Sequence, residues 1–290
     1  MEAFLHQLVS GLAAGGIYAS LALALVMIYQ STHHINFAQG EMAMFSTYLA
    51  WTLLQAGLPY WVAFAATLGI SCAAGMLIER VLIRPVEKAP VLTVVITFIA
   101  LLVIFNSVAG WVFTHTVKVF PSPFGAGLLP RNPFMSPHEF GSIVVTLAVL
   151  VLLYAFFRFT PLGLAMRAAA LNPVSARLSG IRVGRMLALG WGLAAAIGAG
   201  AGMMVAPVGY LDPNMMAGIL LYAFAAALLG GIDNPLGAVV GGFVVGVVEN
   251  LMGAYVIGTE LKLTVALVLI LGVLLFKPAG LFGRAVVTRV

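Results

Sequence analysis

A run of arginines interrupts the apolar sequence near its middle and constrains how the rest of the chain can fold. Between positions 158 and 185 the chain has five arginines and no acidic residue, with long apolar runs on both sides. An arginine at the centre of a bilayer costs about 2.5 to 3.5 kcal/mol, so this segment has to lie in water or among lipid headgroups. The five are Arg158, Arg167, Arg177, Arg182 and Arg185. The segment is therefore predicted to join membrane-spanning helices.

The composition places the whole chain among polytopic membrane proteins. Hydrophobic residues make up 62% of its 290 residues and charged residues 8%, which is too little polar surface for a soluble globular protein. The net charge of +5 does not indicate a nucleic-acid partner, because the basic residues lie between apolar runs and not on a separate polar domain. We expect a single transmembrane domain over residues 1–290, embedded in a lipid bilayer.

The apolar runs predict an all-α bundle of eight or nine membrane segments. A helix needs roughly 20 residues to cross about 30 Å of hydrocarbon. The runs at 218–231 and 262–276 fall short of this and are expected to be half-spans or tilted hairpin arms. All nine runs lie near residues 9–29, 37–57, 62–83, 91–113, 141–158, 186–206, 218–231, 236–256 and 262–276.

The distribution of basic residues predicts the orientation. If all nine runs cross, most of the 14 lysines and arginines lie in or beside the loops near 84–90, 159–185 and 277–290, which share one face. The positive-inside rule makes that face cytoplasmic, with the N-terminus outside and the C-terminus in the cytoplasm. The proline-rich segment 114–140 is then an extracytoplasmic loop, either a plain connector or a contact for an extracytoplasmic partner.

The arginine-rich segment contains signals for a short surface helix. Asn172 is a suitable N-cap, Pro173 fits the first helical position, and Gly180 is placed to end the helix. This short basic helix is predicted to lie on the cytoplasmic face.

Two polar interruptions between apolar runs predict discontinuous helices lining a pathway. In the first, Asn36 is a candidate N-cap, Gly40 lets the backbone open, and Glu41 lies in the first helical turn. The second interruption spans 230–237. Ordinary cytoplasmic hairpin turns remain the alternative for both. The candidate pathway residues are Asn36, Gln39, Gly40, Glu41, Gly231, Asp233 and Glu249.

Glu249 stands alone in an apolar run, so it has to face protein or water. A structural hydrogen bond and a direct contact with substrate both remain open for it.

No further His, Cys or acidic residue stands at ligand spacing near His33 and His34, so we predict no metal site. The sequence also lacks a phosphate-binding loop, a nucleophile elbow and a zinc-protease motif. We expect neither an enzyme nor a bound cofactor.

Small residues recur at helix-packing intervals and predict close helix contacts, within the bundle or against another subunit. The pairs are Gly11/Gly15, Gly198/Gly202, Gly237/Gly241 and Gly242/Gly246.

The chain resembles the integral-membrane permeases of branched-chain amino acid ABC transporters, of the LivH type. The likeness runs nearly end to end. It is carried by INFAQGE at 35–41 with Tyr48, by Glu79-Arg80 and Arg84-Pro85, by TPLG at 160–163 with Met166-Arg167-Ala168, by Asn172-Pro173 and Gly180-Ile181, by Gly230-Gly231 with PLGA at 235–238, by Glu249, and by KPAGLFG at 277–283. Many members of this family have histidine where this chain has Gln39, and arginine where it has Lys277.

The resemblance implies a subunit of an importer in the bacterial inner membrane. Its implied partners are a second, related permease, two cytoplasmic ATPase subunits that hydrolyse the ATP, and an extracytoplasmic solute-binding protein. It also implies that 159–185 holds the coupling helix that docks into an ATPase, with Arg167, Asn172, Pro173, Arg177 and Gly180 as candidate coupling residues. A sugar or nucleoside permease of related architecture and an ion-coupled secondary transporter using Glu41 or Glu249 remain as alternatives.

Overall fold

The computed structural model describes residues 2–87, 89–125 and 135–283, and this part of the chain is helical throughout its regular structure. An isolated β-type bridge pairs Lys118 with Leu211. Within these residues, seven helices are long and apolar enough to cross a membrane. They are α1 (Glu2–Thr32), α3 (Tyr60–Ile78) continued by the π-helical turn η1 (Glu79–Ile83) and α4 (Arg84–Val86), α5 (Val91–Phe113), α6 (Pro137–Phe159), α9 (Val183–Gly209), α11 (Pro235–Met252) continued by the π-helical turn η2 (Gly253–Ile257), and α12 (Lys262–Phe276) preceded by the 3-10 turn η3 (Thr259–Leu261). The predicted all-α polytopic fold is confirmed.

Other helices of the described residues are shorter than these seven. The helix α2 (Gln39–Gln55) has 17 residues, and α10 (Ala217–Gly230) has 14. At roughly 1.5 Å per residue, α10 is about 21 Å long, less than the hydrocarbon thickness of a bilayer. The expectation of a short segment at 218–231 is therefore confirmed. The run at 262–276 is lengthened by η3 to an 18-residue helical stretch, Thr259–Phe276, that is long enough to cross.

The chain divides into two compact units. The first comprises Met1–Val26, Phe124–Val144 and Gly218–Val290, and the second comprises Met27–Pro123 and Val145–Ala217. The division passes through α1 and α6, so both helices contribute to both units. Residues 126–134, which belong to the predicted extracytoplasmic loop 114–140, lie outside the described residues.

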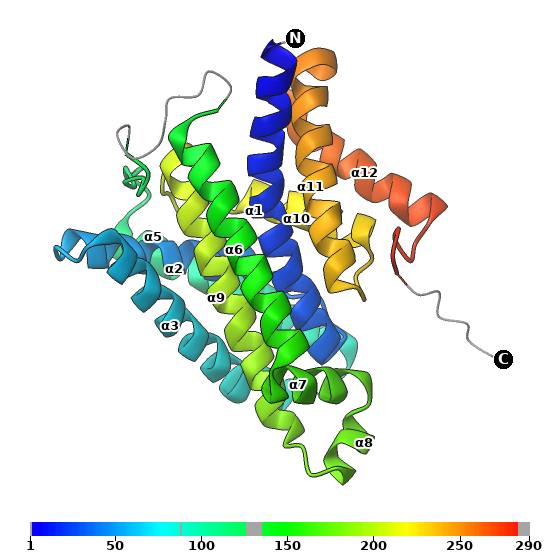
Figure 1. Ribbon diagram of the computed structural model, residues 1–290. Coiled ribbons are helices and arrows are strands. Elements are labelled where there is room, and N and C mark those ends of the chain that lie inside the picture. The colour runs from blue at the N-terminus through cyan, green and yellow to red at the C-terminus, as the bar shows by residue number, and fades with distance from the viewer. Residues whose placement is uncertain (1, 88, 126–134, 284–290) are drawn as a thin grey trace. The chain divides into compact units, whose positions relative to one another are not determined.

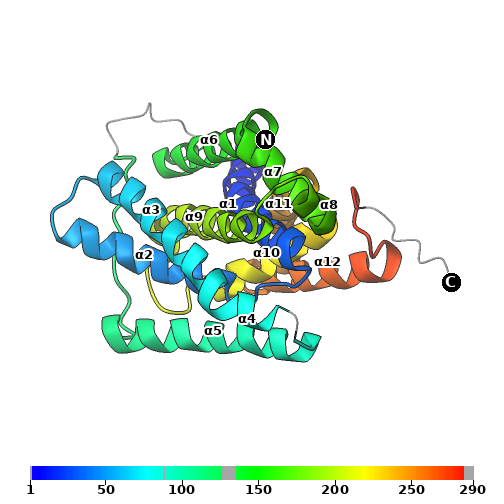
Figure 2. The same ribbon diagram turned by 90° about the horizontal axis from the view of Figure 1, so that it is seen from below.

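In the second unit, α9 packs along α3 and α2, as Figures 1 and 2 show. Glycines allow the backbones to approach. A Cβ atom added to Gly75 of α3 would lie 2.7 Å from the carbonyl oxygen of Trp191, and one added to Gly202 of α9 would lie 2.9 Å from that of Ala43 on α2. The fully buried Trp191 also stacks on Phe98 of α5 at 5.9 Å between ring centroids. The helix α9 is thus the centre of this unit's core.

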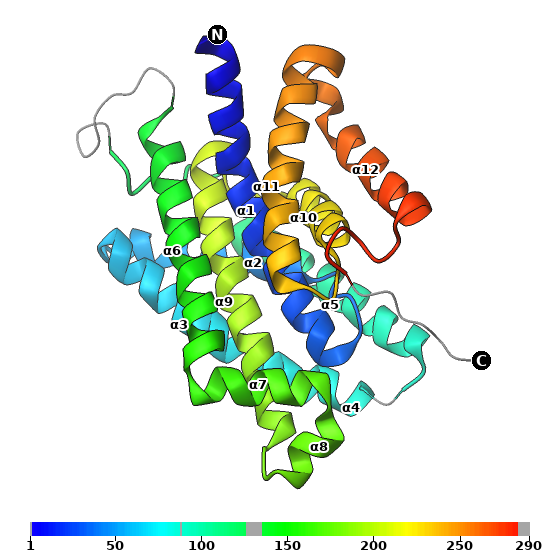
Figure 3. The same ribbon diagram turned by 45° about the vertical axis from the view of Figure 1, so that its right-hand side comes forward.

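In the first unit, α1 crosses α11 at a contact made of glycines (Figure 3). A Cβ atom on Gly11 or Gly15 would come within 2.9 Å of the α11 backbone, and one on Gly242 would overlap the backbone of Ala19. Gly237 faces Gly230 at the end of α10 in the same way. The predicted close packing at these glycine pairs is confirmed, and it occurs between helices of the same chain.

The arginine-rich segment forms two short helices, α7 (Pro161–Leu171) and α8 (Pro173–Leu178), near the start of α9 (Figure 1). Asn172 caps α8 as predicted: its side-chain oxygen accepts hydrogen bonds from the backbone N–H groups of Val174 and Ser175. Gly180 follows the helix with φ +83°, a conformation that favours glycine. The helix α7, capped by Thr160, was not singled out in the sequence.

Candidate transport pathway and coupling surface

The helix α2 begins beside the middle of another helix. Gln39, its first residue, donates a hydrogen bond of 3.0 Å from Nε2 to the carbonyl oxygen of Ala194. Ala194 lies near the middle of α9, which runs from Val183 to Gly209. The first polar interruption therefore lies beside the middle of α9. Discontinuous helices whose ends lie near the middle of the bundle bind substrates or ions in many transporters.

Asn36 and Gln39 organise this start. The Asn36 side chain accepts from the backbone N–H of Ala38 at 3.0 Å and donates to Gln39 Oε1 at 3.3 Å, and both side chains are fully buried. The prediction that Asn36 is the N-cap is wrong, because Ala38 occupies that position and Asn36 closes the turn that precedes it. Gly40 is the second residue of α2 and continues the helix instead of opening it.

Glu41 takes part in a polar cluster that joins three segments of the second unit. Its Oε2 atom accepts a hydrogen bond from Asn106 Nδ2 on α5 at 3.3 Å. The same nitrogen lies 2.9 Å from the carbonyl oxygen of Pro213 and 3.2 Å from Asn214 Oδ1, in the connection between α9 and α10. Glu41 is 6% exposed, whereas Asn214 is exposed, so the cluster extends from the surface of the unit to a buried carboxylate.

The second polar interruption is closed by the C-terminal segment of the same unit. Leu281 and Phe282 donate backbone hydrogen bonds to the carbonyl oxygens of Leu229 and Gly230. Gly231 has φ +106°, and a Cβ atom there would lie 2.6 Å from the backbone nitrogen of Gly283. Two motifs that the sequence showed separately, at 230–237 and 277–283, thus form one joint. Asp233 is exposed in this turn.

Glu249 lies near the other end of α11 from this joint. Its Oε1 atom is 3.6 Å from the Lys262 ammonium nitrogen, and its Oε2 accepts from the Tyr18 hydroxyl at 3.4 Å. Lys262 also donates to Asn250 Oδ1 at 2.8 Å, and Asn250 in turn donates to Gln7. The carboxylate is therefore bonded within the first unit, between α1, α11 and α12.

The surface of α7 and α8 combines cationic and large apolar side chains in the open. Arg167 and Arg177 are exposed, and Leu171 and Leu178 are 80% and 85% exposed. Beneath them, Ala169 and Ala176 are buried against Val183 at the start of α9. Large apolar side chains exposed together mark interaction surfaces, and arginine is among the residues enriched at protein interfaces.

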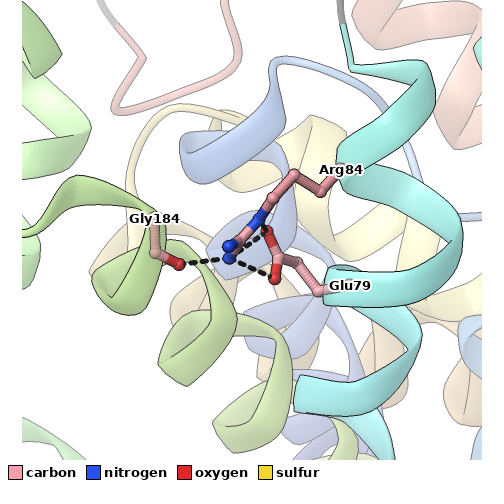
Figure 4. Close-up of polar contacts among 3 residues, drawn as sticks. All are labelled: Glu79, Arg84 and Gly184. Carbon is pink, nitrogen blue, oxygen red and sulfur yellow. Dashed lines mark hydrogen bonds and ion pairs between the residues drawn. The ribbon is translucent and has the colours of Figure 1, made fainter.

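Arg84, at the end of the α3 span, forms an ion pair with Glu79 and a hydrogen bond to the start of α9 (Figure 4). Arg84 donates from Nε to Glu79 Oε1 at 3.1 Å and from its terminal nitrogen to Glu79 Oε2 at 2.8 Å. The same nitrogen donates to the carbonyl oxygen of Gly184. Glu79 is buried, and it lies in the π-helical turn η1, a local distortion that is frequent at functional sites.

Among the described residues, the seven helices long enough to span, the short α2 that starts beside the middle of α9 and the buried polar clusters are typical of a multi-pass membrane protein of the transporter class. The family described as "Branched-chain amino acid transport system / permease component" matches residues 7–274. The chain belongs to this family.

Several relatives match this chain over nearly its whole length. The high-affinity branched-chain amino acid transport system permease protein LivH of Salmonella typhimurium is 33% identical over 304 residues, covering 99% of this chain and 98% of that protein. The permease protein BraD of Pseudomonas aeruginosa, with the same description, is 34% identical over 309 residues and equal coverage. A probable LivH of Methanocaldococcus jannaschii is 28% identical over 91% of this chain and 87% of its own length.

Proposed function

We propose that this chain is the membrane-spanning permease subunit of an ABC importer for branched-chain or other neutral amino acids, or related amides, in the bacterial inner membrane. Its membership of the permease family supports this proposal, as do the names of relatives that match it over nearly their full length. The chain itself moves the solute, and ATP is hydrolysed on partner subunits.

The observation that carries the proposal is the exposed surface of α7 and α8, because a subunit driven by a motor on another chain needs a docking surface for it. Arginines and leucines that lie in the open there fit a groove on a partner protein. The candidate coupling residues are Arg167, Asn172, Pro173, Arg177 and Gly180. Two cytoplasmic ABC ATPases, a second homologous permease and an extracytoplasmic solute-binding protein complete the proposed assembly.

Closure of the ATPases would push α7 and α8, which pack on the start of α9. Because α9 packs along both α2 and α3, this push reaches the polar start of α2, where Asn36, Gln39, Gly40 and Glu41 are the candidate pathway residues. Gly231, Asp233 and Glu249 are the candidates in the first unit. Apolar walls with a few polar groups suit a solute that has an aliphatic side chain and a charged head.

The test is uptake by the complex copurified from native membranes and reconstituted in liposomes with its binding protein. We expect ATP-dependent uptake of radiolabelled leucine that excess valine reduces and excess ribose does not. Competition by ribose instead would indicate a sugar permease. Leucine uptake driven by a proton or sodium gradient without ATP would indicate an ion-coupled carrier.

The proposed orientation has a separate test. Ser175 is exposed on α8, and a Ser175→Cys chain in intact cells should resist an impermeant thiol reagent until the membrane is opened. The unchanged chain is the control, because Cys72 is its only cysteine. Labelling at position 175 in intact cells would place α8 outside the cell and contradict the proposal that it docks a cytoplasmic ATPase.

A further inference from the structure

We propose that Glu41, the Asn214 side chain and the Pro213 carbonyl form the subsite that receives the ammonium group of the solute, and that the Asn106 amide occupies this subsite when solute is absent. The inference rests on the proposed function, since it requires a solute with an ammonium group. It specifies which atoms of the chain bind which part of that solute.

The first argument is the number of hydrogen-bond acceptors. Three oxygens, Glu41 Oε2, Pro213 O and Asn214 Oδ1, lie at 3.3, 2.9 and 3.2 Å from the one nitrogen Asn106 Nδ2. An amide nitrogen carries two hydrogens, so it cannot satisfy three acceptors at once. An ammonium group carries three hydrogens and matches the three acceptors. The amide nitrogen thus marks the position where an ammonium nitrogen would bind.

The second argument is charge. Glu41 is 94% buried, and its hydrogen bond to Asn106, at 3.3 Å, is long for a carboxylate. The ion pairs found among the described residues are Arg84 with Glu79 and Lys262 with Glu249, and neither includes Glu41. A buried carboxylate without a cationic partner is costly, and a solute cation that enters the subsite removes this cost.

The third argument is the surroundings of the cluster. Phe45, one helical turn after Glu41, packs edge-on against Phe105, the neighbour of Asn106, at 5.4 Å between ring centroids. An aliphatic side chain can lie against these rings while its ammonium group binds the three oxygens. Asn214 is exposed, so the cluster reaches the surface of the unit at this residue.

Substitutions of Asn106 and of Glu41, the two partners of this hydrogen bond, should therefore have opposite effects on solute delivery. Glu41→Gln removes the charge that binds the ammonium group, whereas Asn106→Ala removes the group that competes with it. A purely structural hydrogen bond would make the two substitutions harmful in the same direction.

The experiment measures leucine delivered per ATP hydrolysed by the reconstituted complex, with leucine-loaded binding protein outside. We expect Glu41→Gln to lower this ratio roughly 10- to 100-fold, the loss of one charge-assisted hydrogen bond. Asn106→Ala should raise it by about two- to fivefold, because one neutral competing bond is gone. Ser107→Ala, the exposed neighbour on α5, is the matched control and should behave as the wild type.

Folding is monitored by the ATPase stimulation that loaded binding protein produces, which should stay within about twofold of the wild type in each variant. Glu41→Asp keeps the charge and should recover part of the delivery. If Glu41→Gln does not assemble, Asn214→Ala at the exposed end of the cluster should still lower delivery several-fold. Equal losses of leucine delivery in Glu41→Gln and Asn106→Ala, or full delivery by Glu41→Gln, would contradict the proposed subsite. The proposed function would still stand as long as the wild-type complex takes up leucine. A wild-type complex that carries no amino acid would contradict both the subsite and the proposed function.

Discussion

Arg84 holds the buried carboxylate of Glu79 through two of its guanidinium nitrogens, and with the same group it donates to the backbone of Gly184. Through its hydrogen bond to Gly184, Arg84 joins the last turns of the α3 span, where it pairs with Glu79, to the first turn of α9. Since α7 and α8 pack on that first turn, the ion pair is placed to make α3 and α9 move together when the coupling segment is pushed.

Arg84→Gln should therefore weaken both the fold and the coupling. Removal of Arg84 leaves the Glu79 carboxylate buried without its partner, and we expect a loss of about 2 to 3 kcal/mol, reduced from a fully buried pair because the Arg84 side chain is 37% exposed. Thermal unfolding in detergent measures this loss. Arg84→Lys should fall between Arg84→Gln and the wild type, because an ammonium group cannot make the two-pronged contact. The matched control is Arg80→Gln, an exposed arginine of the same turn, for which a change above about 0.5 kcal/mol would contradict the assignment.

Reversal of charge on the coupling surface should separate ATP hydrolysis from transport. Arg167→Glu combined with Arg177→Glu changes two exposed side chains, so the spans should still fold, and ATP-dependent uptake should fall tenfold or more if each arginine contributes at least about 1 kcal/mol to docking. Uptake and copurification of the ATPase are both measured. Arg158→Glu, exposed at the end of α6, serves as the control. Uptake at the wild-type rate in the double variant would contradict the docking surface.

The pair formed by Glu249 and Lys262 can be tested with a double-mutant cycle. Glu249→Gln and Lys262→Met should each destabilise the protein by about 1 to 3 kcal/mol, because each leaves the other group without its charged partner. The combined variant should lose at least about 0.5 kcal/mol less than the sum of the two. Additive losses would show that the two groups do not interact. Normal leucine uptake by a stable double variant would assign Glu249 a structural role and remove it from the pathway.

Because α1 and α11 meet at glycines, the effect of a Gly→Ala substitution on stability should depend strongly on its position. Gly242→Ala would push a methyl group into the Ala19 backbone, so we expect a loss of about 1 to 3 kcal/mol in thermal stability. Gly272→Ala in α12 meets no atom within 4 Å and should be neutral or stabilising by up to about 1 kcal/mol. Equal effects of the two substitutions on the unfolding temperature would contradict this helix contact.

Much of the fold was predictable because it follows from short-range physical chemistry. Apolar length predicts the spanning helices, glycine spacing predicts the close contacts, and the Asn-Pro pair at 172–173 predicts the start of α8. The same rule applied to Thr160-Pro161 would have located α7. The prediction that Asn36 is the N-cap of α2 was wrong. Asn36 accepts a hydrogen bond from the backbone N–H of Ala38, two residues further on, and closes the turn before the helix. An N-cap side chain also accepts a hydrogen bond from a backbone N–H two or three residues further on, so the two arrangements look alike in the sequence.

The partners of the candidate site residues were not predictable, since they depend on which helices meet. Glu249 was found because a carboxylate in an apolar run is costly, whereas Glu41 was found in the first helical turn after a polar interruption. The cost argument, applied to amides, would have identified Asn106. The pairing of the two carboxylates with Asn106 and Lys262 brings together residues far apart in the chain. Glu79 and Arg84 stood in two separate motifs of the sequence, and their ion pair and its link to Gly184 appear only in the folded structure.

The most direct test of the account compares this chain alone with the chain in its complex. Both preparations are reconstituted in liposomes with leucine and binding protein outside and, for the complex, with ATP supplied to the ATPase side. We predict that the complex accumulates leucine above its external concentration only when ATP is present, and that the isolated chain accumulates none under any ion gradient. Concentrative uptake by the isolated chain, or by the complex without ATP, would contradict the account.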